Sequence, residues 1–377
     1  MRRLFLSMSP FALSACGLIL GFDGYSDHYD DPPDPGLVPD GGKEKSDAKD
    51  SAATTDAPRP TNTDCPLPAD PSAIGCERAT VFALAATDNA VLWLSGARGA
   101  VLHTLASGVQ SVIQPAPPSP IGGSAVARDA RLRWGFRLQT ESSVQACDAP
   151  ACTPAPIGPP VTNLRWLSMS GAGLYALTGD GASSRLLAID AVTPFDFTPP
   201  PETNGISHFA VNEKFAYWRL DDKNKQSCEL ASCVPSEAKR TGNAPYLGLG
   251  QDRFVSVGND QNIPRVIICP STPGISDCED SALLDFSKDA FDPDRNTFLN
   301  LSAVALSSKE EIYVGGQDAN DPTKVKIRKA PSAKTDLSAP LLAELPGTAV
   351  TALAVNGTQL FYAVKNGDQT IIYVQPL

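Results

Sequence analysis

Histidine, charged residues and long helical segments are all scarce in this sequence. Only three His occur among 377 residues, and Asp, Glu, Lys and Arg together make up 19%. Because many hydrolytic and metal-dependent sites rely on His, its scarcity argues against such an enzyme. The low charge content, with 29 Gly and 34 Pro, argues against a coiled coil or an exposed helical protein. The net charge of −11 argues against a nucleic-acid partner.

The motifs of several common enzyme classes are also missing. The chain has no phosphate-binding loop, Rossmann glycine pattern, zinc-protease motif or Gly-x-Ser-x-Gly elbow. We therefore expect no cofactor, and no catalytic residue can be nominated.

The first sixteen residues have the features of an export signal. A positive start is followed at residues 4–12 by a mainly apolar stretch, which is too short to span a bilayer as a helix. The ending Leu13-Ser14-Ala15-Cys16 resembles the bacterial lipoprotein box. This resemblance implies a signal peptide at residues 1–15, acylation of Cys16 (for example by palmitate) and a membrane anchor through that lipid. We expect the outer membrane of a Gram-negative bacterium, on its periplasmic or surface side. The alternatives are an incidental cysteine or, because Arg2-Arg3 resembles a twin-arginine signal, export after folding.

Residues 16–64 differ in composition from the rest of the chain. Residues 17–64 contain eleven Asp and Glu against four Lys and Arg, so this segment carries −7 of the net charge. So few aliphatic and aromatic side chains cannot bury enough apolar surface to offset the entropy of ordering the chain. We predict a disordered acidic tether.

Residues 65–377 contain seven similar windows of eleven residues. Each window has strand-forming residues at both ends and turn-forming residues in the middle, which predicts a strand, a tight turn and a second strand. The windows start 38 to 57 residues apart. They are LAATDNAVLWL (84–94), VARDARLRWGF (126–136), LSMSGAGLYAL (167–177), FAVNEKFAYWR (209–219), LGLGQDRFVSV (247–257), VALSSKEEIYV (304–314) and LAVNGTQLFYA (353–363).

A small residue occupies the second position of every window, as expected where innermost strands crowd around a central channel. These residues are Ala85, Ala127, Ser168, Ala210, Gly248, Ala305 and Ala354. A third apolar strand follows several windows. A period near 42 residues with three or four strands in each unit is typical of a β-propeller blade. We therefore predict an all-β fold over residues 65–377, a seven-bladed β-propeller, with six or eight blades as alternatives.

The window LAVNGTQLFY at residues 353–362 resembles the blades of exported bacterial propeller lipoproteins of unassigned function. The repeats lack the Trp-Asp ending, the kelch double glycine and the Asp-box. The resemblance therefore implies a fold and an exported location but no activity.

Eight cysteines remain besides Cys16, and they form four close pairs in the sequence. Three pairs recur at the end of a third strand, and an exported location favours oxidation, so we predict local disulfides. Zinc is the alternative, but zinc sites favour tighter pairs and a reducing compartment. The predicted bridges are Cys65–Cys76, Cys147–Cys152, Cys228–Cys233 and Cys269–Cys278.

The chain ends directly after the third strand of the seventh unit. An open edge there leaves backbone groups unpaired. We therefore predict that residues within 70–82 supply the missing outer strand, held by the Cys65–Cys76 loop.

One segment has a weak resemblance in spacing to a calcium loop. Asp292, Asp294 and Asn296 place oxygen ligands at alternate positions, but Thr297 stands where a sharp-turn glycine belongs. A solvated acidic insertion is the alternative, and we assign no metal site.

Histidine and arginine offer few further candidates. We expect His103 and His208 to be structural or, for His208, exposed near a channel mouth. Arg131, Arg133 and Arg137 share one face of a predicted strand and would either receive an acidic partner or be solvated.

Three functions stay open at this point. The first is a non-enzymatic propeller lipoprotein that binds an unknown protein or glycan at the cell envelope. The alternatives are an exported enzyme, a hydrolase or lyase acting on a glycan or lactone, and a scaffold for outer-membrane assembly. Fold alone does not choose between them.

We predict that Cys16→Ser blocks lipidation and releases the protein from the membrane, because the thiol is the acceptor of the lipid. Detergent phase partitioning of membrane fractions measures this, with Cys65→Ser as a control that keeps the anchor. Unchanged partitioning of the Cys16→Ser protein contradicts the lipoprotein assignment.

Overall fold

The structure is a computed structural model, and it describes most of residues 65–377. The signal segment, the tether, Cys16 and the calcium candidates Asp292, Asp294 and Asn296 lie outside the described residues. The gaps after residue 64 are 192–195, 200–204, 221–224, 234, 238–245, 250–252, 261–262, 271–282, 286–297, 308, 310 and 331–339.

The described strands form seven four-stranded antiparallel sheets, which run from an inner strand at the axis to an outer strand at the rim. We number the sheets as blades and give the strands of each from the inside outward. Blade 1 consists of β2 (Val81–Ala86), β3 (Ala90–Ser95), β4 (Gly99–Thr104) and β5 (Val109–Gln114), and blade 2 of β6 (Gly122–Arg128), β7 (Arg131–Arg137), β8 (Glu141–Asp148) and β9 (Ala155–Thr162). Blade 3 consists of β10 (Leu164–Ser170), β11 (Gly173–Thr178), β12 (Arg185–Ala191) and β13 (Asp196–Phe197), and blade 4 of β14 (Ile206–Val211), β15 (Phe215–Leu220), β16 (Lys225–Glu229) and β17 (Ser236–Glu237). Blade 5 consists of β18 (Tyr246–Leu249), β19 (Arg253–Asp260), β20 (Ile263–Pro270) and β21 (Leu283–Asp285). Blade 6 consists of β22 (Phe298–Leu306), β23 (Ile312–Asp318), β24 (Lys324–Ala330) and β25 (Leu341–Pro346). Blade 7 consists of β26 (Ala349–Val355), β27 (Gln359–Asn366), β28 (Gln369–Pro376) and, as its outer strand, β1 (Ala73–Glu77).

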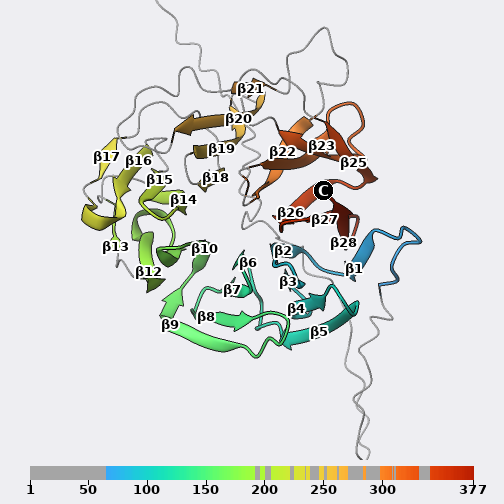
Figure 1. The fold of residues 1–377 in the computed structure, drawn as a ribbon, viewed down its shortest axis with the longest axis horizontal. Helices are drawn as coiled ribbons and strands as arrows, with labels where there is room; N and C mark the ends of the chain where they lie inside the picture. The colour runs from blue at the N-terminus through green and yellow to red at the C-terminus, as the bar shows by residue number, and fades with distance from the viewer. Residues whose placement is uncertain are drawn as a thin grey trace, which may run out of the picture.

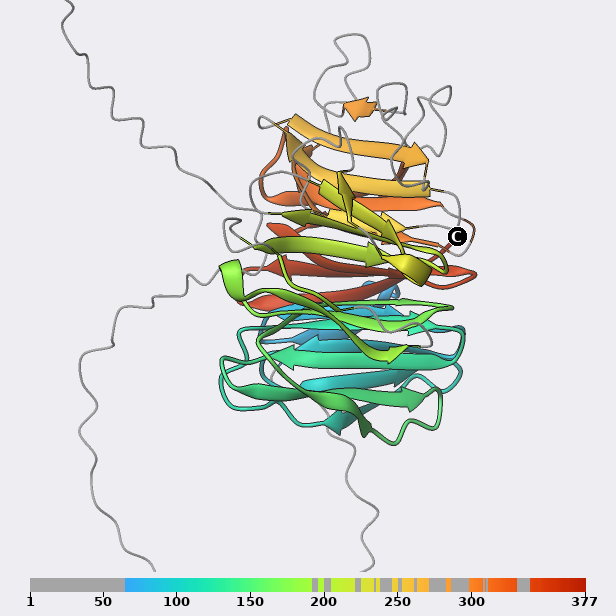
Figure 2. The same ribbon diagram turned by 90° about the vertical axis from the view of Figure 1, so that its left-hand side faces the viewer.

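The sheets are arranged as a ring around a central axis, which confirms the predicted all-β propeller architecture (Figure 1). Each inner strand contacts the inner strand of the next sheet, and β26 contacts β2, so the ring is closed. The strands lie across the thickness of the disc (Figure 2). The helical elements among the described residues are two short 3-10 turns, Gly181–Ser183 and Leu230–Ser232.

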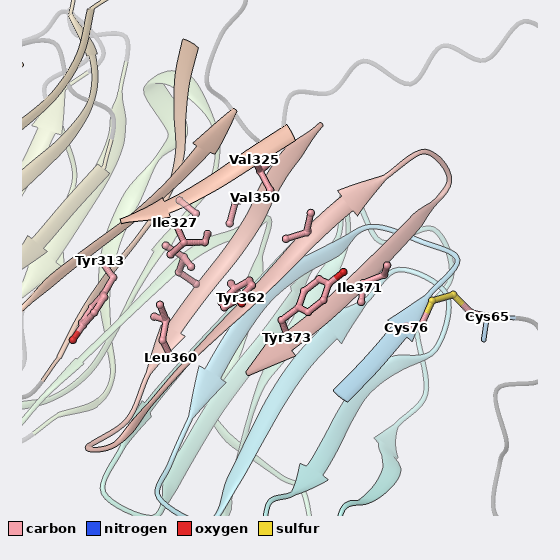
Figure 3. Packing of buried hydrophobic residues seen from close by; sticks show 13 residues of the cluster. Cys65, Cys76, Tyr313, Val325, Ile327, Val350, Leu360, Tyr362, Ile371 and Tyr373 are labelled. Atoms are coloured by element: carbon pink, nitrogen blue, oxygen red, sulfur yellow. A yellow bond between two sulfur atoms is a disulfide. The ribbon is translucent and has the colours of Figure 1, made fainter. Parts of the chain in front are cut away.

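Hydrophobic clusters fill the spaces between neighbouring sheets. Successive residues of a strand point to opposite faces, so Leu92 of β3 packs toward blade 2 while Trp93 packs toward blade 7. Figure 3 shows one such cluster, in which Val325 and Ile327 of blade 6 meet Val350 of blade 7. Among the described residues, such clusters lie between six of the seven neighbouring pairs of sheets, and there the blades hold one another in place.

The N-terminal strand β1 closes the ring, as the sequence predicts. It pairs antiparallel with β28, the last strand of the chain, with Cys76 opposite Ile371 and Glu77 opposite Thr370. The disulfide from Cys76 to Cys65 lies beside this pairing (Figure 3). The outer edge of β28 is thereby covered by a strand from the other end of the folded region.

A buried carboxylate ties this closing strand to blade 1. Glu77 is 1% exposed, and its carboxylate accepts hydrogen bonds from Trp93 Nε1 at 2.8 Å and Ser95 Oγ at 2.9 Å. Arg98 Nη1 lies 3.0 Å from the same carboxylate and supplies the opposite charge. Buried charges need such partners, so Glu77 ties β1, the outer strand of blade 7, to blade 1.

Three of the four expected cysteine pairs are disulfide-bonded in the structure, at Cα–Cα distances of 4.9 to 5.6 Å. Cys147 ends the third strand of blade 2, and Cys152 precedes its outer strand β9. Cys228 and Cys233 occupy the equivalent place in blade 4. Cys269 lies in β20, whereas Cys278 is outside the described residues, so the fourth pair stays a prediction.

We predict that Glu77→Ala lowers the free energy of unfolding by about 3–5 kcal/mol, because it leaves Arg98 and two hydrogen-bond donors without their buried acceptor. Urea denaturation of the full chain measures the change. The control Glu213→Ala removes a carboxylate whose side chain is 44% exposed, and should lower stability by no more than about 1 kcal/mol. Equal effects of the two substitutions contradict the closing role of Glu77.

Candidate functional site

Small side chains line the central channel. At the second window position, six residues border a cavity of about 260 Å³ at the centre of the ring. They are Ala85, Ala127, Ser168, Ala210, Ala305 and Ala354. The seventh, Gly248, lies in the inner strand β18. Larger side chains at these positions would fill the channel and press the inner strands apart.

Hydroxyl groups connect neighbouring inner strands around this channel. Ser124 Oγ accepts a hydrogen bond from the Leu167 N–H at 2.9 Å, which joins β6 to β10. Ser168 Oγ accepts one from the Val211 N–H at 3.0 Å, which joins β10 to β14. Backbone groups on the free side of an innermost strand need such partners, because no further strand lies there.

One end of the channel widens into a polar cavity of about 440 Å³, which we call the hairpin mouth. The turns of six inner hairpins border it, and no aromatic side chain belongs to the lining that the structure describes. The turn residues of the hairpin mouth are Thr87, Asp88, Arg128, Asp129, Ser170, Asn212, Glu213, Ser307, Asn356 and Gly357.

In five of the inner hairpins, a polar side chain at the fourth window position accepts backbone hydrogen bonds that stabilise the turn at this end of the strand. Asn212 Oδ1 accepts hydrogen bonds from the N–H groups of Lys214 at 2.9 Å and Phe215 at 2.7 Å. Asn356 makes the same pair of bonds, and Thr87, Ser170 and Ser307 use their hydroxyl groups in the same way. Short polar side chains favour such turns because they satisfy backbone donors locally.

Two sets of contacts bridge blades across the hairpin mouth. Arg128 of blade 2 forms an ion pair of 2.9 Å with Glu213 of blade 4, and the Gly171 N–H of blade 3 donates to the same carboxylate at 3.2 Å. Asn356 of blade 7 donates its side-chain amide to the Thr87 carbonyl of blade 1 at 2.9 Å. The ion pair is exposed and adds at most about 1 kcal/mol, so its main effect is to hold the turn tips in position.

The opposite end of the channel is smaller and less polar. Its cavity of about 180 Å³ is bordered by Phe82 and Trp166 and by the hydroxyl-bearing residues Ser124, Ser302 and Thr351. The two mouths therefore differ in chemistry: charged and aromatic-free at one end, aromatic at the other.

His103 is buried and His208 is partly buried, in agreement with a structural role. His208 lies in β14 with its ring edge-on to Trp166, at 6.1 Å between centroids. Burial, together with the charges of Arg165 and Arg219, lowers the pKa of His208 to about 3. Burial also lowers the pKa of His103, which lies beside Trp93. Both imidazoles are therefore neutral at pH 7 and poorly placed to act as surface bases.

The three arginines of β7 do not form a free basic row. Arg131 is exposed, but Arg133 donates to the carbonyls of Leu132 at 2.9 Å and Cys147 at 3.2 Å. Arg137 donates to Asn163 Oδ1 at 2.6 Å and to Asp180 Oδ1 at 2.9 Å. Two of the three guanidinium groups therefore already have partners within the chain.

Metal binding finds no support among the residues that the structure describes. Within those residues, no three His, Cys, Asp or Glu side chains gather into a possible ion site. The same part of the chain contains no helix that is both long and apolar enough to cross a membrane.

Sequence reasoning missed the contacts that join different blades at the hairpin mouth and at the ring closure. No motif marks Glu77 or Glu213, because the partners of both residues lie in a different unit of the repeat. One signal existed for the mouth: the fifth window position holds an acidic residue in two blades, at Asp88 and Glu213. An acidic residue at a turn tip is common on any surface, so this signal was weak.

Neither a family model nor a curated relative matches this chain. Solved structures do resemble it. The structure of U3-55K has a TM-score of 0.55 at 14% identity, covering 81% of this chain and 98% of that chain. The WD40 repeats of RRP9 give 0.55 at 13% identity, covering 82% and 99%. The WD40 β-propeller domain of Doa1 gives 0.54 at 12% identity, covering 79% and 93%.

Identity this low shows the fold alone. The chain therefore carries a β-propeller domain.

We predict that acid destabilises the fold partly through His208. Its pKa is lower in the folded state than the ordinary value of 6.5, so the unfolded chain takes up more protons between about pH 3 and 6.5. Stability should therefore fall as the pH drops below 6.5. His208→Gln should flatten this dependence between pH 7 and 5, as measured by urea denaturation at each pH. An unchanged slope contradicts a partly buried, neutral His208.

Proposed function

We propose that the protein is a non-enzymatic β-propeller scaffold that binds a protein partner at the hairpin mouth. The observation that supports this most is the mouth itself: a cavity of about 440 Å³ ringed by polar and charged turn residues. Its shape suits a protruding polar segment of another protein, because hydrogen-bonding groups converge on it from six blades.

The turn tips around the mouth are held in place before any partner arrives. The side-chain hydrogen bonds within the turns, and the bridges from Arg128 to Glu213 and from Asn356 to Thr87, restrict their movement. Restricting a surface in advance reduces the entropy lost on binding. The mouth therefore has the rigidity expected of a recognition surface.

A glycan fits the hairpin mouth less well than a protein does. Sugar rings commonly stack on aromatic side chains, and the aromatic residues Phe82 and Trp166 border the opposite mouth. The enzyme alternative would use the carboxylates of the mouth, Asp88, Asp129 and Glu213, but Glu213 is already paired with Arg128, and the described lining has neither a histidine nor a cysteine to act with the other two, so we propose binding and not catalysis.

We further propose that the seven sheets form one seven-bladed disc and that a lipid on Cys16 anchors it at the cell envelope. Residues 17–64 would then act as an acidic spacer between the membrane and the disc. The support for this anchor is the resemblance of Leu13-Ser14-Ala15-Cys16 to the lipoprotein box.

Site-specific photo-cross-linking in the producing cells tests the binding site. A photoreactive residue in place of Lys214, an exposed turn residue, should form an adduct with another protein. Adding Asp88→Lys and Asp129→Lys should reduce that adduct by about tenfold or more, because these changes reverse two exposed charges at the mouth.

The matched control carries Asp148→Lys and Asp368→Lys, which make the same change of net charge at exposed positions that do not border the mouth. This control should keep the adduct. Equal loss in both double variants, a glycan adduct or no adduct at all contradicts the proposal.

A further inference from the structure

The inner strands, which surround the axis of the ring (Figure 1), share an irregularity two residues before the start of the window. In five of them the pairing with the second strand of the blade shifts by one residue there, which is a β-bulge. A bulge bends its strand and redirects the side chain of the extra residue, and bulges are frequent next to active sites. The extra residues are Phe82, Arg165, Ser207, Ser302 and Thr351.

Three of these residues gather at the smaller mouth of the channel, which we call the aromatic mouth. Phe82, Ser302 and Thr351 border its cavity of about 180 Å³, together with Trp166 of blade 3. Ser124 borders it as well and occupies the same repeat position in β6, where the strand pairing is regular. Side chains from five blades therefore converge on this end of the channel.

The hydroxyl groups of the aromatic mouth differ in their hydrogen bonding. Ser124 Oγ is bonded to the Leu167 N–H of the next blade, and Ser302 Oγ donates to the Val350 carbonyl of the next blade at 2.9 Å. Thr351 Oγ1 is buried and has no hydrogen-bond partner among the described residues. An unpaired buried hydroxyl group costs free energy. Because Thr351 borders the cavity, a rotation about its Cα–Cβ bond can bring the hydroxyl group to a ligand there.

Trp166 supplies a flat apolar surface for the same cavity. It packs against the hydrophobic cluster between blades 3 and 4 and also against the cluster between blades 5 and 6, on the other side of the channel. The ring of His208 contacts it edge-on, at 6.1 Å between centroids. Trp166 borders both the central cavity and the aromatic mouth, so the indole lies between them and is held from both sides.

The lining of the aromatic mouth favours a small neutral ligand. Its described lining contains no charged side chain, so a charged ligand would lose hydration without gaining an opposite charge. Pockets for drug-sized molecules have volumes of about 300–1,000 Å³, so this smaller cavity suits a single ring.

The polar groups of the mouth narrow the choice of ring. Hydroxyl groups both donate and accept hydrogen bonds, and an indole covers an apolar face, which are the contacts that a sugar ring needs. A phenyl or indole ring would fill the space but leave the hydroxyl group of Thr351 without a partner.

We propose that the aromatic mouth binds a neutral pyranose sugar, with the apolar face of the ring stacked on Trp166 and hydroxyl groups of the sugar bonded to Thr351 and Ser302. Thr351 donates the hydrogen bond that it lacks within the chain, and Ser302 accepts one while it keeps its bond to Val350. This site lies at the opposite end of the channel from the hairpin mouth, so either proposal stands if the other fails.

Tryptophan fluorescence of the full chain tests this site, with Cys16→Ser included to keep the protein free of detergent. Three of the four tryptophans, Trp93, Trp134 and Trp218, are fully buried, so a ligand at the aromatic mouth acts on the emission of Trp166. The probes are D-glucose, D-galactose, D-mannose and N-acetyl-D-glucosamine. At least one of them should change the emission in a saturable way, and saturation-transfer NMR should show contact with the same sugar.

Two variants separate sugar binding from folding. Thr351→Val keeps the shape of the side chain and removes only the hydroxyl group, so the urea midpoint should not fall. The dissociation constant for the sugar should nevertheless rise by about threefold to tenfold, because one hydrogen bond is lost. Trp166→Leu should abolish the saturation-transfer signal, because the stacking surface is gone.

The matched control is Thr162→Val, which makes the same change at an exposed position of the outer strand β9 and should keep the affinity for the sugar. Failure of all four sugars to give a saturable signal overturns the proposal. So does an equal affinity of the Thr351→Val and Thr162→Val proteins. Saturable binding of phenol or indole in place of every sugar also overturns it, because the mouth then accepts an aromatic side chain.

Discussion

The pairing of β1 with β28 is the contact on which the rest of the disc depends. It joins a strand from the start of the folded region to the last strand of the chain, so it converts a row of sheets into a ring. A row would leave blade 1 and blade 7 each with an uncovered hydrophobic face. Closure buries both faces, as the cluster containing Trp93, Phe361 and Ile372 shows. Glu77 ties β1 to blade 1, and the Cys65–Cys76 disulfide bridges β1 to the residues that precede it, so the closing strand is held on two further sides.

The ring then imposes different requirements along its radius. At the centre, inner strands are crowded, so the second window position is small and borders a narrow channel. Farther out, large side chains such as Trp134 and Trp218 are fully buried between neighbouring sheets. At the rim the sheets end in free edges, where charge, proline and strand length become the important variables. Each repeat therefore meets a different requirement at the channel, between the sheets and at the rim.

Rigidity and recognition are connected through the inner hairpins. The same side chains that make the hairpins turn, among them Asn212 and Asn356, also define the border of the hairpin mouth. The bridge from Arg128 to Glu213 passes over blade 3, so turn tips from three blades act as one surface. The disc can therefore present a fixed arrangement of charged groups without a histidine or a metal among the described residues at its centre.

The repeat in the sequence was sufficient to determine much of this protein: the all-β fold, the inner hairpins, the small residues of the channel and the origin of the closing strand. These features are local or periodic, so strand alternation, turn residues and cysteine spacing reveal them. Only the tertiary structure decided that Glu77 is buried against Trp93 and that Arg128 reaches Glu213. Those features depend on which residues the closed ring brings together, and residues distant in the chain leave no pattern in a single sequence.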